Sequence, residues 1–226
     1  RLRCDWSSDV CSSDLTNDEP HRKGINQGQF TVCLMLKEKT SKKQVEQLKK
    51  TLLIWGLLGA LGSRARRGFG SIAIKQLEGQ SFVFNDVDEY YAEIKTILND
   101  SVLAPEMPIF TALNEAMQIA RFGQGNDARK LMNRLGSQYK DARKDAGAGM
   151  AKLPFGLPLA GSRGTSDENN RRSSPLFMHI HTIGKQYVAI VSFIPAVFHP
   201  EYPLGEKLDF YKTVQDYMNT MERVYP

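Results

Sequence analysis

Residues 56–70 of the chain read Gly56-Leu-Leu-Gly-Ala-Leu-Gly-Ser-Arg-Ala-Arg-Arg-Gly-Phe-Gly70. This stretch holds five of the chain's 18 glycines and three arginines, and it separates a helical pattern from a strand-like one. Because glycine has no Cβ, main-chain N–H groups can approach a bulky anion closely. Arginine adds fork-shaped donors that suit phosphate oxygens. The stretch therefore predicts a loop that binds a polyanion, with a nucleic-acid backbone as the first candidate.

The sequence around this loop predicts a strand, a helix, the loop and a second strand. The apolar run 28–36 is typical of a buried strand. Ser41 and Gln44 form a capping box for a helix that we expect to end within residues 59–62. Residues 69–77 then predict the next strand. This order is that of the second half of a ferredoxin-like β-α-β-β-α-β domain whose first half would lie upstream.

The N-terminal residues have a different origin in our interpretation. Cys4-Asp-Trp-Ser-Ser-Asp-Val-Cys-Ser-Ser-Asp-Leu15 matches, residue by residue, the conceptual translation of a short-read sequencing adapter. We therefore interpret residues 1–15 as an artefact, expect them to be disordered and exclude them from fold reasoning. The chain would then lack its true N-terminus. Cys33 remains as a lone cysteine, which we expect to be buried and which fits a reducing, cytoplasmic setting.

Beyond Gly79 the sequence predicts a second unit of helices and strands. A β-hairpin is expected from residues 176–181 and 187–194, which flank Gly184. Three segments have apolar residues at helical spacing, namely 86–98, 126–144 and 208–224. We therefore expect an α+β protein with two packed domains, residues 16–78 and residues 79–226.

The composition of the chain indicates which kinds of partner it can bind. The formal net charge of +5 permits nucleic-acid binding without requiring it. The longest apolar run, residues 52–61, is half of the roughly 20 residues needed to cross a bilayer, so no membrane partner is expected. The sequence contains no P-loop, dinucleotide fingerprint or zinc-ligand spacing. We therefore expect no cofactor and no metal.

The residues that carry the polyanion prediction also resemble a known family. Leu58-Gly-Ala-Leu-Gly-Ser-Arg-Ala-Arg-Arg-Gly-Phe-Gly-Ser-Ile72 is similar to the glycine-rich signature of the CRISPR-associated RAMP superfamily. Within it, the sequence is most similar to the first-subunit family of type III-B (Cmr) effector complexes. Two further pieces agree in order, Phe155-Gly-Leu-Pro158 and Arg171-Arg-Ser-Ser-Pro-Leu176. The N-terminal strand of the family and its basic motif are absent here.

The resemblance implies tandem ferredoxin-like (RRM-like) domains, the first incomplete, in a non-catalytic subunit of an antiviral effector. Its partners would be CRISPR RNA, target RNA and other RAMP subunits of a Cmr-type complex, and it would lie near the 3′ end of the guide. A guide must be held independently of its sequence, so contacts are expected on phosphates and sugars. The expected RNA-binding residues are Gly59, Gly62, Ser63, Arg64, Arg66, Arg67, Gly68, Phe69, Gly70, Arg171 and Arg172.

Several of these features have a simpler structural explanation. The glycines at 56, 59 and 62 also fit a helix that packs closely on its sheet. Phe69 fits a core residue as well as a base-stacking one. The lysines of residues 37–50 indicate a solvated helix face rather than a binding site. Arg171 and Arg172 equally fit the flank of a mobile loop.

Two other functions remain open from the sequence. His179 and His181 are two residues apart on a predicted strand, so they share a face and could act as general acid and base. They would make the chain a metal-independent CRISPR RNA-processing endoribonuclease of the same superfamily. Since no acidic residue or cysteine lies nearby in sequence, we assign no catalytic residue. The third possibility is a scaffold whose basic loop binds protein partners.

Overall fold

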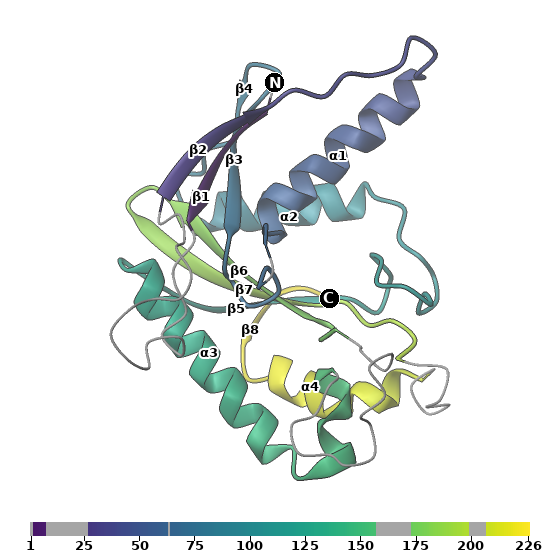
Figure 1. Cartoon of the computed structure of the whole chain (residues 1–226), viewed down its shortest axis with the longest axis vertical. Helices are drawn as coiled ribbons and strands as arrows, with labels where there is room; N and C mark the ends of the chain where they lie inside the picture. The colour runs from purple at the N-terminus through teal and green to yellow at the C-terminus, as the bar shows by residue number, and fades with distance from the viewer. Residues whose placement is uncertain (1, 8–26, 63, 157–172, 199–206) are drawn as a thin grey trace.

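The computed structural model describes residues 2–7, 27–62, 64–156, 173–198 and 207–226. Its framework is two four-stranded antiparallel sheets with helices packed against them (Figure 1). We call them sheet A and sheet B. The combination of helices with antiparallel sheets confirms the α+β prediction.

Sheet A contains β1 (Leu2–Ser7), β2 (Gln27–Val32), β3 (Ser71–Leu77) and β4 (Gln80–Ser81) in the order β2-β1-β3-β4. The expectation of disorder is wrong for Leu2–Ser7, because this strand pairs with β2 on one side and β3 on the other. Its residues alternate apolar and polar, which is the strand period. Residues 8–15 lie outside the described residues.

Helix α1 (Lys42–Leu58) begins as the sequence predicts. The Ser41 hydroxyl accepts from the Gln44 N–H, and the Gln44 side chain accepts from the Ser41 N–H. The helix ends where Gly59, with extended backbone, donates to the Trp55 carbonyl. Close packing on β3 depends on Gly56, since a Cβ there would lie 2.5 Å from Cγ1 of Ile74.

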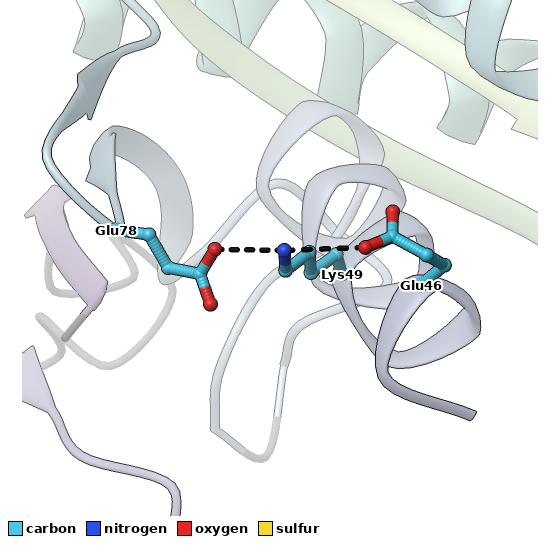
Figure 2. A network of polar contacts seen from close by, with 3 residues as sticks. All are labelled: Glu46, Lys49 and Glu78. Carbon is cyan, nitrogen blue, oxygen red and sulfur yellow. Dashed lines mark hydrogen bonds and ion pairs between the residues drawn. The ribbon is translucent and has the colours of Figure 1, made fainter. Parts of the chain in front are cut away.

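An exposed ion-pair network attaches α1 to the turn between β3 and β4 (Figure 2). The Lys49 ammonium lies 2.8 Å from Glu78 and 3.3 Å from Glu46. Hydrogen bonding to Glu78, then to Glu46, raises the pKa of Lys49. Glu78 and Gly79 both have positive φ, as a two-residue type I′ hairpin turn requires.

The sequence overestimates the strand before α1. β2 ends at Val32, and residues 33–36 are exposed, with Met35 at 97% of its full accessibility. Cys33 is exposed rather than buried. The apolar run predicted a buried strand because it is apolar, yet only the part that pairs with β1 lies in the sheet.

Sheet B is built from β5 (Gln118–Gly125), β6 (Leu176–Ile183), β7 (Gln186–Phe193) and β8 (Glu222–Tyr225) in the order β6-β7-β5-β8. Helix α3 (Ala128–Asp145) follows β5, and α4 (Lys212–Met218) follows β7. The hairpin across Gly184 is confirmed. The single helix predicted over 208–224 is wrong, because it divides into a 3-10 turn at Leu208–Tyr211, α4 and β8.

Helices bury both faces of sheet B. Alternate residues of β7 point to opposite sides, so Val191 packs with α3 and α4 while Ile190 packs with α2 (Val87–Asn99). The end of α1 joins the α2 side through Leu57 and Leu58. Figure 1 shows the resulting layers, with α1 and α2 on one side of sheet B and α3 and α4 on the other. Among the described residues, no helix is long and apolar enough to cross a membrane.

Candidate nucleic-acid interface

The predicted loop, residues 59–70, lies between the two sheets and closes on itself. Leu61 donates to the Gly70 carbonyl at 2.8 Å, and Ala60 pairs with Ser71, so the two ends of the loop run side by side. Gly62, Gly68 and Gly70 have φ of +99°, +80° and +64°, a backbone region that favours glycine. The glycines therefore set the turns of the loop. We call residues 59–70 the glycine-basic loop.

Most of these glycines do not face solvent. Gly68 and Gly70 are buried, and a Cβ on Gly68 would lie 3.6 Å from Met132 of α3 and 3.8 Å from Ile180 of β6. A Cβ on Gly59 would lie 2.5 Å from the Trp55 carbonyl oxygen. Gly62 is exposed with open space around it. Of the three glycines for which close packing of helix on sheet was the alternative, Gly56 fits it, Gly59 meets Trp55 of its own helix and Gly62 meets nothing within 4 Å. At Gly68 the positive φ favours glycine.

The three arginines of the loop pack on aromatic rings. The Arg67 guanidinium lies 3.9 Å from the ring centroid of Tyr139, and that of Arg66 lies 4.2 Å from Phe177. Arg66 also donates to the Ser174 carbonyl. The exposed Arg64 lies 5.9 Å from the Phe69 ring. A guanidinium stacked on a ring keeps its charge and has its N–H donors in its own plane, where they can meet a phosphate.

Main-chain bonds fix the loop against the outer edge of β6. Met178 donates to the Arg66 carbonyl at 3.2 Å, and Ile180 donates to the Ser71 hydroxyl at 3.0 Å. The Ser71 hydroxyl in turn donates to the Gly68 carbonyl at 2.8 Å. The loop amides of Ala65 and Arg67 are used within the loop, on the carbonyls of Gly62 and Arg64. Side-chain cations are therefore better placed for a ligand than those two amides.

His179 and His181 lie in the interior of the molecule, on the face of β6 that packs against α1 and α2. Their side chains are 0% and 2% exposed. His179 Nδ1 lies 2.8 Å from the Gly59 carbonyl oxygen, and its Nε2 lies 3.0 Å from His181 Nδ1. Because a carbonyl only accepts, His179 carries its proton on Nδ1, and His181 then donates to His179. The His181 ring stacks on Tyr90 with centroids 4.3 Å apart.

Burial keeps this pair uncharged. Desolvation lowers the pKa of His179 to about 4, although the bond to Gly59 opposes the shift. The pKa of His181 is also well below its usual value, first through desolvation and then through His179. Burial likewise raises the pKa of the Tyr90 hydroxyl, which donates to the Leu57 carbonyl at 2.6 Å. The shared face predicted for the histidines is real, but it is a packed face that no substrate reaches.

The structure brings together only part of the predicted site. Ser63, Arg171 and Arg172 lie outside the described residues. Two residues that the sequence did not single out support the arginines, Tyr139 under Arg67 and Phe177 under Arg66. Arg143, one turn beyond Tyr139 on α3, lies 5.8 Å from the same ring. Within the described part of the chain, no group of three or more potential metal ligands occurs.

Comparisons with known proteins agree with this architecture. Residues 5–73 match the model of the RAMP superfamily, and residues 117–218 match that of the Cmr1-like C-terminal region. A CRISPR system Cmr subunit, Cmr1-1 of Pyrococcus furiosus, is 29% identical over 170 residues, which cover 67% of this chain and 50% of the relative. The chain therefore spans about half the length of this curated relative.

Solved structures show the same fold. A crystal structure of Cmr1 from Pyrococcus furiosus in its apo form aligns with a TM-score of 0.53 at 24% identity, over 83% of this chain and 61% of that one. A type III-B Cmr-β complex bound to cognate target RNA and AMPPnP contains a chain that aligns with a TM-score of 0.53 at 15% identity, over 87% of this chain and 56% of that one.

These matches define the class of protein, because the two family models cover the glycine-basic loop and parts of both sheets, with β4 and β8 outside them. The chain belongs to the RAMP superfamily. Within that superfamily it is similar to Cmr1-like proteins, through its residues 117–218 and through the curated Cmr1-1 relative.

Proposed function

We propose that the chain is a non-catalytic RNA-binding subunit of a type III-B effector complex. In this role it binds the backbone of CRISPR RNA and target RNA near the 3′ end of the guide, beside other RAMP subunits in the cytoplasm. The observation that carries the proposal is that one loop holds three arginines, Arg64, Arg66 and Arg67, and that each guanidinium lies against an aromatic ring. Ring-supported guanidiniums offer charge without reading bases, as a guide-holding subunit requires.

We further propose that sheet B with α3 and α4 is a ferredoxin-like domain. Its strand, helix, strand, strand, helix, strand order and its sheet order support this assignment. Sheet A with α1 would be the incomplete partner domain. Since β4 still pairs with β3, the division falls within residues 78–85, just before α2.

The experiment replaces two loop cations without removing the anchor of the loop. Arg64→Gln/Arg67→Gln is the test variant, and Arg66 is left in place because it binds Ser174. The control is Lys42→Gln/Lys43→Gln, which removes the same charge from the start of α1, about 24 Å along that helix from the loop. Affinity for a fluorescein-labelled single-stranded RNA of about 30 nucleotides is measured by anisotropy against salt.

We expect the loop variant to bind roughly tenfold more weakly at about 0.1 M salt, with a salt slope smaller by about 1.4, because two phosphate contacts are lost. The control should keep the wild-type slope. Equal affinity of loop variant and wild type would contradict the proposal and favour the protein-binding scaffold.

The endoribonuclease alternative is disfavoured by the burial of both imidazoles. Incubation of the chain with CRISPR repeat RNA in chelator tests it directly. We expect intact RNA. Specific cleavage that His181→Phe abolishes would establish the enzyme instead.

A further inference from the structure

Helix α3 carries a row of cations beside the glycine-basic loop. Arg129, Gly136, Lys140 and Arg143 follow one another at intervals of seven, four and three residues, so they lie on one face of the helix. We call these four residues the α3 stripe. Arg129, Gly136 and Lys140 are exposed, and Arg143 is half-buried.

Contacts on neighbouring residues show which way this face points. Met132 and Tyr139, which border the stripe, face the loop, the first at Gly68 and the second under Arg67. The Arg143 guanidinium shares the Tyr139 ring with Arg67. One cation of the loop and one of the helix therefore lie at the same aromatic ring.

The opposite exposed face of α3 differs from the α3 stripe, because it carries acidic residues and points away from the glycine-basic loop. It carries Lys130 and Arg134 together with both acidic residues of the helix, Asp141 and Asp145. Arg134 lies 5.8 Å from the ring of Phe122 on β5, on the far side of α3 from the loop. Within α3, the cations beside the loop thus have no acidic neighbour on their own face.

Gly136 has no packing role that the structure shows. It is exposed in the middle of an 18-residue helix, and a Cβ there would meet nothing within 4 Å. Glycine in a helix interior is less stable than alanine, so its presence calls for another reason. A missing side chain between two cations leaves the helix backbone open to close approach by a phosphate or sugar.

We propose that the α3 stripe continues the polyanion site of the loop and that single-stranded RNA crosses α3 over Gly136. This inference rests on the proposed function and adds the direction of the strand. Arg129 and Arg143 are about 21 Å apart along the helix, which spans several phosphates. On sheet B itself, helices cover both faces and the loop occupies the β6 edge, so α3 is the cationic surface next to the loop.

The chemistry of the stripe fits RNA better than an acidic protein. A protein interface needs apolar residues at its centre, and the stripe has none. Cations on both sides of a glycine instead suit a backbone charge that is bound without base readout.

The first test compares two charge-matched variants of α3 in the full chain. Arg129→Gln/Lys140→Gln removes two stripe cations, and Lys130→Gln/Arg134→Gln removes two from the opposite face. With the same labelled RNA of about 30 nucleotides, the stripe variant should reduce the salt slope by about 1.4, whereas the control should keep it. Circular dichroism verifies that both variants are folded.

The second test probes close approach with no change of charge. Gly136→Gln should weaken RNA binding several-fold, whereas Gly136→Ala, which adds one methyl group, should weaken it less. Equal affinity of Gly136→Gln and wild type would overturn the route over Gly136.

Comparison with the loop variant keeps the two proposals separate. If Arg64→Gln/Arg67→Gln loses affinity while the stripe variant behaves like its control, the α3 inference is wrong and the proposed function stands. If neither variant loses affinity, the proposed function fails as well. Displacement of RNA by polyglutamate from wild type but not from the stripe variant would assign the stripe to an acidic protein and overturn the inference.

Discussion

Gly56 and Gly136 both lie inside helices, yet their surroundings are opposite. Gly56 is buried at the contact of α1 with β3, whereas Gly136 is exposed on α3 with open space around it. Helix propensity alone favours alanine at both positions by about 1 kcal/mol. The space beside each glycine therefore decides whether alanine at that position raises or lowers the free energy of unfolding.

We predict that Gly56→Ala lowers the free energy of unfolding by about 1–2 kcal/mol, because its methyl group would lie 2.5 Å from the buried Ile74 side chain. Gly136→Ala, its matched control, should raise that free energy by about 0.5–1 kcal/mol. Urea unfolding measures both. A stabilising Gly56→Ala would mean that α1 and β3 are less closely packed.

The buried histidines predict how stability depends on pH. His179 titrates near 6.5 when unfolded and at about 4 when folded, so between these values the unfolded chain binds more protons. The free energy of unfolding should therefore rise with pH over this window. As the pH falls below about 6.5, the protein should become progressively less stable. Each imidazole adds a slope of up to about 1.4 kcal/mol per pH unit.

His181→Phe removes one of these groups and retains a ring that can pack on Tyr90. We expect a smaller slope of stability against pH between about 6.5 and 5 than in wild type, measured by urea unfolding at several pH values. The same slope in both proteins would show that His181 is not held neutral by burial.

At the scale of elements, a single hydroxyl connects the start of β3 to β6. The Ser71 side chain, 2% exposed, donates to the Gly68 carbonyl and accepts from the Ile180 N–H. Its loss would leave both main-chain groups without this partner in a buried place, which is costlier than losing one exposed bond.

We predict that Ser71→Ala lowers the free energy of unfolding by about 1–3 kcal/mol. Ser81→Ala on the exposed strand β4 is the control and should change it by less than about 0.5 kcal/mol. Thermal and urea unfolding compare the two. Similar small effects would mean that the loop is not fixed to β6 through Ser71.

Elements with local signals were predicted well, and those that depend on distant partners were not. α1, α2 and α3 begin within two residues of their predicted starts, because Ser41, Asp86 and Asp127 are side-chain caps. β5 was not predicted, because its two glycines and Arg121 interrupt the alternation of apolar and polar residues that marks a strand. It forms a strand because it pairs with β7 on one side and β8 on the other. β8 was predicted as helix for the same reason.

The candidate site shows the same division. The glycine-basic loop was located from the sequence, because glycine at positive φ leaves a local signal. Its aromatic supports were not, since Tyr139 and Phe177 are far from the loop in sequence and reach it only through the fold. The histidine pair was placed on one face correctly, but whether that face is buried depends on α1 and α2.

At the scale of the whole molecule, the two sheets share a core. Leu57 and Leu58 of α1, which also packs on sheet A, lie in one buried cluster with Ile94 of α2 and Val188 of β7. The bonds of His179 to Gly59 and of Tyr90 to Leu57 cross the same junction. Separate unfolding of either sheet would expose this cluster.

We therefore predict a single cooperative transition. Tryptophan fluorescence, which reports on Trp6 in β1 and Trp55 in α1, and far-ultraviolet circular dichroism should give the same urea midpoint. Val191→Ala in sheet B should lower both midpoints together. Two separate midpoints would mean that the sheets unfold independently.

The position of the glycine-basic loop also bears on self-association. β6 is an outer strand of eight residues, and the amides of Leu176, Met178 and Ile180 bond to Ser174, Arg66 and Ser71 respectively. An uncovered outer strand offers such groups to a strand of another molecule, which is how sheets extend into aggregates. The glycine-basic loop, which we propose binds RNA, therefore also covers an edge strand that could otherwise pair with another molecule. We expect a variant whose loop detaches from β6 to aggregate under conditions in which the rest of the chain is still folded.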